Sequence, residues 1–228
     1  MTTSTGTDQL VRLLQLASPA LPAGAYSYSG GLEAAIEAGL VRDAASAERW
    51  IGAVLAHPVA RMEAPAFLRL CTAWRAGDLD AVKQWNEIFL ASRETAELRA
   101  ETVQMGYALS RLLDDLVGPR QERSGATEHE FAFPTAFARA AVAWGIEPDA
   151  ALAGYLWAWL ENQVMAAVKA VPLGQTDGQR ILLALGARLG AVAAEARSLE
   201  DEELGAFAPR LAILSARHET QYSRLFRS

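Results

Sequence analysis

Apolar residues recur every three or four positions along most of the chain, and this spacing is that of one face of an α-helix. Leu10, Leu13, Leu14 and Ala17 follow it near the N-terminus, and the spacing returns in segment after segment as far as residue 216. No segment alternates apolar and polar positions with the β-branched residues typical of a strand. The pattern predicts an all-α fold, with residues 1–228 forming a single helical-bundle-like domain of about eight to ten helices.

Short polar side chains and glycines mark where these helices begin and end. Asp43 or Ser46 can accept the free amide hydrogens at the start of one helix, and Asp78 can do the same for another. Gly39 and Gly77 suit helix ends, where the chain often turns through a left-handed conformation. We therefore expect helix boundaries at these positions.

Other boundaries follow from longer patterns. Pro58 predicts a break or kink in a helix, because proline lacks the amide hydrogen that a helix interior needs. Residues 92–117 and residues 181–196 each have the spacing of one continuous helix, and residues 173–179 (LGQTDGQ) predict a turn. The polar segment 119–130 (PRQERSGATEHE) is the clearest linker or loop.

Composition narrows the class of protein. Apolar residues make up 51% and charged residues 21% of the chain, as in a folded globular protein. The single cysteine excludes an intrachain disulfide, and no apolar run reaches the roughly 18–20 residues of a membrane span. The polar N-terminus lacks the apolar core of a signal peptide, and a net charge of −6 disfavours nucleic-acid binding. We expect a soluble, cytoplasmic protein.

The C-terminal segment 217–228, called the tail below, is unusual for a chain end. Residues 210–228 carry a charge of +3, whereas residues 1–209 carry −9. Tyr222, Leu225 and Phe226 give the tail three large apolar groups, although chain ends are usually polar and frayed. The tail should therefore dock on its own domain or on a partner, and the partner is the interpretation we favour.

The segment SPALPAGAYSYSGGLE, residues 18–33, is the second unusual feature. Its prolines stiffen the chain, while Tyr26 and Tyr28 can project from it as a binding surface would require. Glu33 falls in the first turn of the next helix, where a carboxylate is favoured by the helix dipole. The plainer interpretation is a connecting loop followed by a capping glutamate.

Catalytic and metal-binding motifs are not evident. Each histidine, at positions 57, 129 and 218, lacks a second ligand at metal-binding spacing, so we expect surface or capping histidines. Cys71 shares a helix face with Phe67 and Trp74 and is expected in the core. Ser27 and Ser29 lack the flanking glycines and the preceding strand of a nucleophile elbow. Lys169 can be explained as a cation at a helix C-terminus.

Three segments together resemble one family. LLQLASPALPAGAYSYSGGLEAAIEAG (residues 13–39), VMAAVKAVPLGQTDGQRILL (164–183) and SARHETQYSRLFRS (215–228) closely resemble urease accessory protein F, the UreF family. The match spans the chain, but residues 42–150 match mainly in helical pattern and in LASRETAELRAE. One departure is Gly30, where the family commonly has a polar residue.

The resemblance implies a dimeric, all-α protein without catalytic activity, cofactor or metal ligands of its own. Its implied partners are urease accessory protein D (called H in some organisms), the accessory GTPase protein G and apo-urease, to which the assembly delivers nickel. It implies that Glu33 and Lys169 belong to surfaces concerned with the GTPase, and that residues 222–227 become ordered on protein D. Gly174 and Gln175 match a family signature without a separate role.

The candidate partner-binding residues lie in the loop, near the Lys169 segment and in the tail. They are Tyr26, Ser27, Glu33, Lys169, Gln175, Arg217, His218, Glu219, Tyr222, Arg224, Leu225 and Phe226.

Two other functions remain open at this point. The chain could be a helical enzyme whose site is assembled from distant residues such as Ser27, Glu33 and Lys169. It could also be a helical interaction domain unrelated to nickel.

Overall fold

A computed structural model describes residues 6–117 and 131–228, and its regular elements there are all helical, which confirms the predicted fold class. No helix in these ranges is both long and apolar enough to cross a membrane. Because α3, η2 and α4 form one uninterrupted helical run, the helices agree with the predicted eight to ten. The elements are α1 (Gly6–Ala17), η1 (Ala25–Ser27), α2 (Leu32–Glu37), α3 (Ala44–Val54), η2 (Leu55–Glu63), α4 (Ala64–Ala76), α5 (Leu79–Ala91), α6 (Ala96–Val117), α7 (Phe133–Ala143), α8 (Pro148–Ala170), α9 (Gln175–Gly186), α10 (Leu189–Ser198), η4 (Asp201–Glu203) and α11 (Pro209–His218).

Several helix boundaries follow from the local sequence as predicted. The Asp43 side chain accepts a hydrogen bond from the amide of Ser46 at 2.8 Å at the start of α3. The Asp78 side chain accepts one from the amide of Ala81 at 3.0 Å at the start of α5. Gly77 ends α4 with a φ of 68°, which favours glycine. The predicted linker 119–130 lies outside the described residues.

Of the break or kink expected at Pro58, the break does not occur. Instead the helix continues through nine residues of π-helix, η2, between α3 and α4. A π-turn changes the amide–carbonyl pairing by one residue, which accommodates the missing amide hydrogen of Pro58 within a continuous helix. Pro58 therefore modifies the helical hydrogen bonding without ending the helix.

Three other boundaries differ from the predictions. The helix expected over residues 92–117 begins only at Ala96, because the Thr95 hydroxyl accepts from the Leu98 amide at 3.2 Å and caps it. The turn expected over residues 173–179 is already the first turn of α9. The helix expected over residues 181–196 is divided into α9 and α10 at Ala187 and Arg188.

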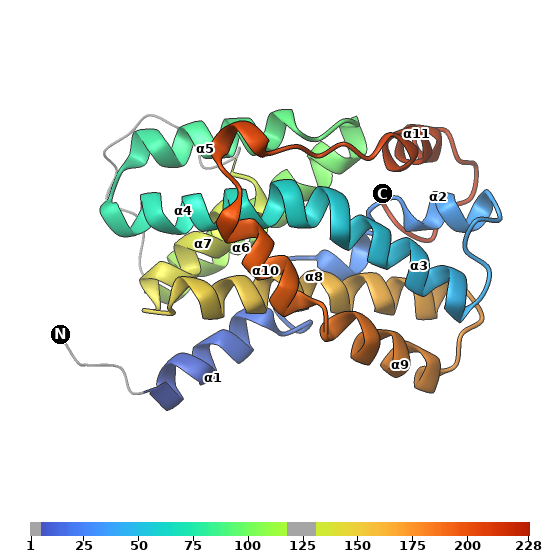
Figure 1. The fold of residues 1–228 in the computed structure, drawn as a ribbon, viewed down its shortest axis with the longest axis horizontal. Coiled ribbons are helices and arrows are strands. Elements are labelled where there is room, and N and C mark those ends of the chain that lie inside the picture. The colour runs from blue at the N-terminus through green and yellow to red at the C-terminus, as the bar shows by residue number, and fades with distance from the viewer. Residues whose placement is uncertain (1–5, 118–130) are drawn as a thin grey trace.

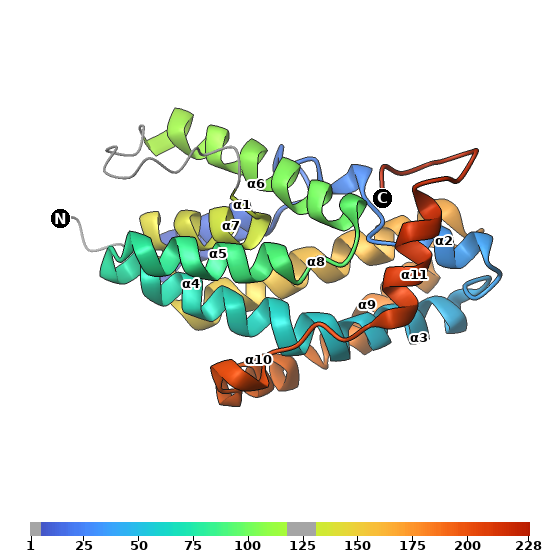
Figure 2. The same ribbon diagram turned by 90° about the horizontal axis from the view of Figure 1, so that it is seen from above.

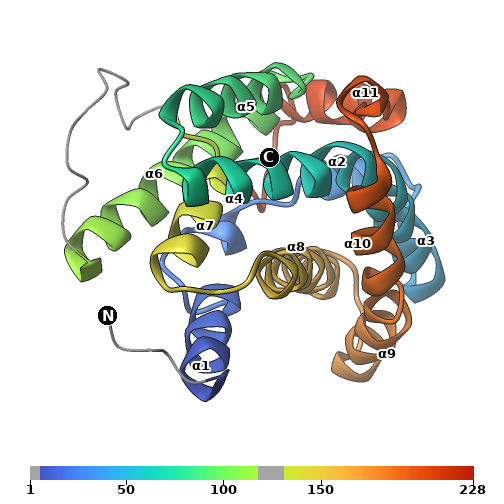
Figure 3. The same cartoon turned by 60° about the vertical axis from the view of Figure 1, so that its left-hand side comes forward.

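Helix α8, of 23 residues, forms the centre of the arrangement (Figure 1). It packs against α1, α4, α7, α9 and α10. When α8 is viewed nearly end-on, α1 and α9 lie on its two sides, and α4 and α7 cover it from above (Figure 3). Each end of α8 therefore meets a different set of helices and belongs to a different part of the core.

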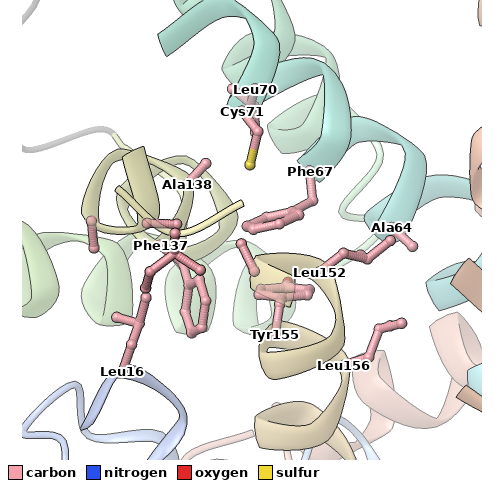
Figure 4. Packing of buried hydrophobic residues seen from close by; sticks show 14 of the residues in the cluster. Leu16, Ala64, Phe67, Leu70, Cys71, Phe137, Ala138, Leu152, Tyr155 and Leu156 are labelled. Atoms are coloured by element: carbon pink, nitrogen blue, oxygen red, sulfur yellow. The ribbon is translucent and has the colours of Figure 1, made fainter. Parts of the chain in front are cut away.

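The first part of the core is an aromatic cluster. Phe67, Phe137 and Tyr155 face one another from α4, α7 and α8 (Figure 4), and Phe67 stacks on Tyr155 with ring centroids 4.9 Å apart. Cys71 is buried beside them, which confirms its expected place in the core. Burial raises the pKa of the Cys71 thiol to about 12, so it stays protonated and unreactive near neutral pH.

The second part of the core lies at the C-terminal end of α8. Here α2, α3, α9 and α11 pack together, with Leu32, Ile51, Leu160 and Val164 among the buried side chains. Phe226 from the tail belongs to the same cluster and is only 5% exposed. The tail is thus docked on its own domain, where it completes this part of the core.

The loop–tail junction as a candidate partner-binding site

After α11 the chain turns back and lies beside the loop before α2 (Figure 2). The Arg227 amide donates to the Ser27 carbonyl at 2.8 Å, and the Ser29 amide donates to the Ser228 carbonyl at 3.2 Å. The Ser29 hydroxyl also donates to the Ser228 carbonyl. We call this contact between residues 24–33 and the tail the loop–tail junction. Ser27 takes part through its backbone carbonyl. Its side-chain hydroxyl is not used in this contact, so the contact requires no nucleophilic serine.

Glycine suits the loop at Gly30 and Gly31. Both have positive φ, 57° and 82°, a conformation that side-chain-bearing residues rarely adopt. A Cβ atom on Gly30 would lie 3.1 Å from Gln163 Nε2, and one on Gly31 would lie 2.8 Å from Leu211 Cδ1. The glycine at position 30 therefore fits the backbone of this loop and its close approach to α8.

Glu33 anchors the tail. Its carboxylate accepts hydrogen bonds from the Leu225 amide at 2.6 Å and from the Phe226 amide at 2.8 Å. The same carboxylate lies 3.2 Å from His218 Nε2, and Glu33 is 9% exposed. Hydrogen bonds to a charged acceptor are among the stronger ones in proteins. Glu33 is therefore more than the helix cap of the plainer interpretation, because it binds the backbone of a segment almost two hundred residues away.

His218 lies in the last turn of α11 and is fully buried, so of the surface or capping position expected for it, the surface position was wrong. Its Nδ1 atom lies 2.7 Å from a Glu97 oxygen, while its Nε2 atom faces Glu33. Only an imidazole with hydrogen on both nitrogens can donate to both carboxylates at once. Arg224 adds a cation, since its Nη1 lies 2.8 Å from Glu97. The two carboxylates and two basic side chains thus compensate one another.

Lys169 reaches the junction from the last turn of α8. Its Nζ atom lies 4.7 Å from the ring centroid of Phe226, within the range of a cation–π contact. Lys169 and Glu33 therefore hold the same tail residue, one through its ring and the other through its amide. The sequence had suggested no direct relation between these two side chains and the tail.

Other predicted residues face outwards. Tyr26 is 71% exposed, Leu225 50%, and Tyr222 is fully exposed. Arg217 and Glu219 are exposed as well. These side chains surround the clamped part of the tail, so the junction presents aromatic and apolar groups on a backbone that is already held in place.

A cleft of about 520 Å³ lies next to the junction. It is bounded by the end of α1, the loop, α8 and the tail, and most of its lining side chains are apolar. Tyr26, Lys169, Gln175 and Phe226 all contribute to its wall. Burial raises the pKa of Glu161, which also lines the cleft. Four predicted partner-binding residues from separate segments therefore meet around one apolar cleft.

The sequence interpretation missed two acidic residues of α6. Glu97 faces His218 and Arg224, as described above, and Glu101 accepts a hydrogen bond from the Ser228 hydroxyl at 2.7 Å. Burial, with a smaller contribution from the charges of Glu63 and Glu97, raises the pKa of Glu101 to about 7. The signal was present in LASRETAELRAE, where Glu97 and Glu101 are four residues apart and share a helix face.

Neither an isolated base nor a metal site is evident at the junction. Glu63 is paired with Arg93 at 2.7 Å and accepts from the Tyr155 hydroxyl at 3.0 Å. Within residues 6–117 and 131–228, no group of three or more histidine, cysteine or acidic side chains is arranged to hold a metal ion. The geometry is that of a clamp on a chain segment.

Comparison with known proteins identifies the family. The sequence model of the UreF family matches residues 41–186. A urease accessory protein UreF of Dechloromonas aromatica (strain RCB) is 57% identical over 226 residues, covering 96% of this chain and 98% of that protein. The protein of the same name from Azoarcus sp. (strain BH72) is 60% identical over 223 residues, covering 96% of this chain and 95% of that protein. One from Janthinobacterium sp. (strain Marseille) is 53% identical over 221 residues.

Proposed function

The chain belongs to the UreF family, and we propose that it is a urease maturation co-chaperone of the cytoplasm. In this proposal it assembles, as a homodimer, with urease accessory protein D or H and with the GTPase protein G. The assembly inserts nickel, its cargo, into apo-urease. The chain contributes binding surfaces and influences the GTPase step, and it catalyses no reaction itself.

The observation that carries this proposal is the convergence of the predicted partner residues at the loop–tail junction. Tyr26, Tyr222 and Leu225 are exposed there, although the segments that bear them are tied down by backbone hydrogen bonds. Holding aromatic and apolar groups in place before contact reduces the entropy lost on binding. Such an arrangement suits a protein partner, and we assign the junction to protein D or H.

We further propose that Glu33 and Lys169 influence the GTPase step through the tail. With the tail docked, the Glu33 carboxylate is occupied by the two tail amides and by His218, so a partner cannot reach it directly. Lys169 is exposed but lies over the Phe226 ring. Both side chains thus affect where the tail lies, and this connects two surfaces that the sequence interpretation treated separately.

The contacts of Glu33 also argue against the helical-enzyme alternative. A site made of Ser27, Glu33 and Lys169 would need a carboxylate free to accept a proton from a substrate or from the serine. The hydrogen bonds of Glu33 are instead made to the tail, and Ser27 contributes its carbonyl oxygen. The proposal of a binding protein accounts for these contacts more simply.

The test uses a double variant, Tyr222→Ala with Leu225→Ser, which removes exposed side chains and leaves the backbone bonds to Glu33 possible. We expect binding to purified protein D or H to weaken at least tenfold and nickel-dependent urease activation to fall. The matched control is Leu183→Ser, because Leu183 is 79% exposed on α9. Unchanged binding and activation in the double variant would refute the role of the junction.

A further inference from the structure

An adaptor between two proteins needs two separate binding surfaces. The sequence suggested one surface at the tail and another at Glu33 and Lys169, but the structure joins all of these at the loop–tail junction. If the proposed function holds, the second partner therefore requires a surface elsewhere on the chain.

A second apolar cleft lies at the N-terminal end of α11. It has a volume of about 500 Å³ and is formed by α3, the start of η2 and the segment that leads into α11. Figure 2 shows this segment running along the α3–α4 helix from α10 to α11. The Gly205 amide fixes it to the Arg61 carbonyl at 3.1 Å. We call this site the α3–α11 cleft.

The apolar lining of the α3–α11 cleft is open to contact. Trp50, Val54 and Leu211 contribute to its wall, and Phe207 stands beside them with 83% of its surface exposed. Phe207 lies between the Gly205 hydrogen bond and the start of α11 at Pro209. Both restrain the backbone around it, so its position is largely set before binding. Exposed aromatic side chains at a preformed cleft are typical of protein-binding surfaces.

The charged side chains that line the α3–α11 cleft are basic. They are Arg49 and Arg210, and no aspartate or glutamate lines it. Neither Arg49 nor Arg210 forms an ion pair with any carboxylate that the structure describes. In a chain with a net charge of −6, this local excess of positive charge complements an acidic partner.

We propose that the α3–α11 cleft is the docking site for the second partner protein of the assembly. The segment that binds there is acidic and carries an apolar side chain. Its apolar side chain enters the cleft beside Phe207, and its carboxylates pair with Arg49 and Arg210. The inference rests on the proposed function, because it assumes that two different proteins bind this chain.

Helix α11 connects the two surfaces. Leu211 lines the α3–α11 cleft, while Ser215 bonds to Thr95 at 2.8 Å and His218 meets Glu33 farther along the same helix. The two partners would thus bind near opposite ends of one helix.

The experiment compares two charge-reversed variants with equal net charge. The test variant is Arg49→Glu with Arg210→Glu, and the control is Lys83→Glu with Arg180→Glu, whose side chains are 62% and 74% exposed outside the cleft. Binding is measured separately with purified protein D or H and with purified GTPase. The GTPase is offered both to the chain alone and to the chain saturated with protein D or H. A third variant, Phe207→Ser, tests the apolar contact.

We expect the test variant to lose affinity for the GTPase by at least tenfold and to bind protein D or H normally, while the control binds both; loss of protein D or H binding alone would overturn the inference. Phe207→Ser should weaken the same partner by roughly three- to tenfold. Salt screens charge pairs, so rising ionic strength should weaken the binding of that partner to the wild type. The residual binding to the test variant, which lacks the two arginines, should depend less on salt. If the test variant bound both partners normally, the inference would be wrong but the proposed function would stand. The same holds if the substitutions changed only self-association. Failure of the wild type to bind either partner would overturn the proposed function as well.

Discussion

The aromatic core and the loop–tail junction are held together by different forces. Around Phe67, Phe137 and Tyr155, large rings contact one another and exclude water, so the stabilisation is spread over many weak contacts. At the junction, a few hydrogen bonds to Glu33, Glu97 and Glu101 hold a short segment, and Phe226 is the one large apolar side chain of the tail that is buried. The first region should open only when the domain unfolds, whereas the second can open by itself. A clamp of this kind lets a tail dock on its own domain and still be released to a partner.

The largest expected effect is in the aromatic core. Phe137→Ala removes a fully buried ring that contacts both Phe67 and Tyr155. We expect the free energy of unfolding to fall by about 3–5 kcal/mol, because the variant loses apolar burial and leaves a cavity. Chemical denaturation monitored by circular dichroism measures this change. Phe207→Ala is the control and should stay within about 0.5 kcal/mol, since Phe207 is 83% exposed.

A smaller global effect but a large local one is expected for Glu33→Gln. The substitution keeps the shape of the side chain but removes the charge that two tail amides and His218 share. Losing hydrogen bonds to a charged group should favour tail opening by about 1.5–3 kcal/mol. If opening is fast, trypsin should then cut the tail roughly 10- to 100-fold faster, and circular dichroism should show that the helices remain.

The matched control for Glu33→Gln is Glu219→Gln, the same chemical change at an exposed position in the tail. Its trypsin cleavage rate should equal that of the wild type. If both variants were cut at the same rate, Glu33 would not hold the tail and the contrast between core and junction would lose its basis.

These two regions also show what the sequence could predict. Helix class and the Asp43 and Asp78 caps depend on residues close together in the chain, so the sequence was sufficient. The burial of His218 depends on Glu33 and Glu97, which are more than a hundred residues away, and no local pattern reports such a contact. At Pro58 the sequence predicted a break or a kink, but it did not indicate a π-helix, because the π-turn is an uncommon way to accommodate a proline.

The junction should also respond to pH through Glu101. Burial raises the pKa of Glu101 from its ordinary 4.5 to about 7, so the folded state binds its proton more tightly than the unfolded state does. The stability that this group contributes is therefore complete below about pH 4.5 and is lost as pH rises through about 7. The charges of Glu63 and Glu97 add to this rise in pKa, whereas the hydrogen bond from Ser228 and the charge of Arg93 oppose it.

The measurement is the free energy of unfolding and the tail cleavage rate between pH 5 and 8 in the wild type and in Glu101→Gln. The wild type should lose stability relative to the variant as pH rises, because the glutamine cannot ionise. Parallel pH profiles would show that Glu101 titrates normally and that the junction gains nothing from its protonation.

The smallest effect separates two explanations of Lys169. As a cation near the end of α8, it would stabilise the helix by about 0.3–1 kcal/mol, and Lys169→Ala would lower the free energy of unfolding without affecting the tail. As a partner of the Phe226 ring, it would hold the tail by about 0.5–1 kcal/mol at this exposed position, and Lys169→Ala would speed trypsin cleavage of the tail roughly two- to fivefold. Lys169→Arg is the matched variant, because arginine retains both the charge and the ability to lie over an aromatic ring. Rescue of tail protection by arginine, together with rescue of urease activation, would place the role of Lys169 in the tail clamp. If trypsin cut the tail of Lys169→Ala at the wild-type rate, Lys169 would act only as a charge at the end of α8. The clamp would then depend on the carboxylates alone.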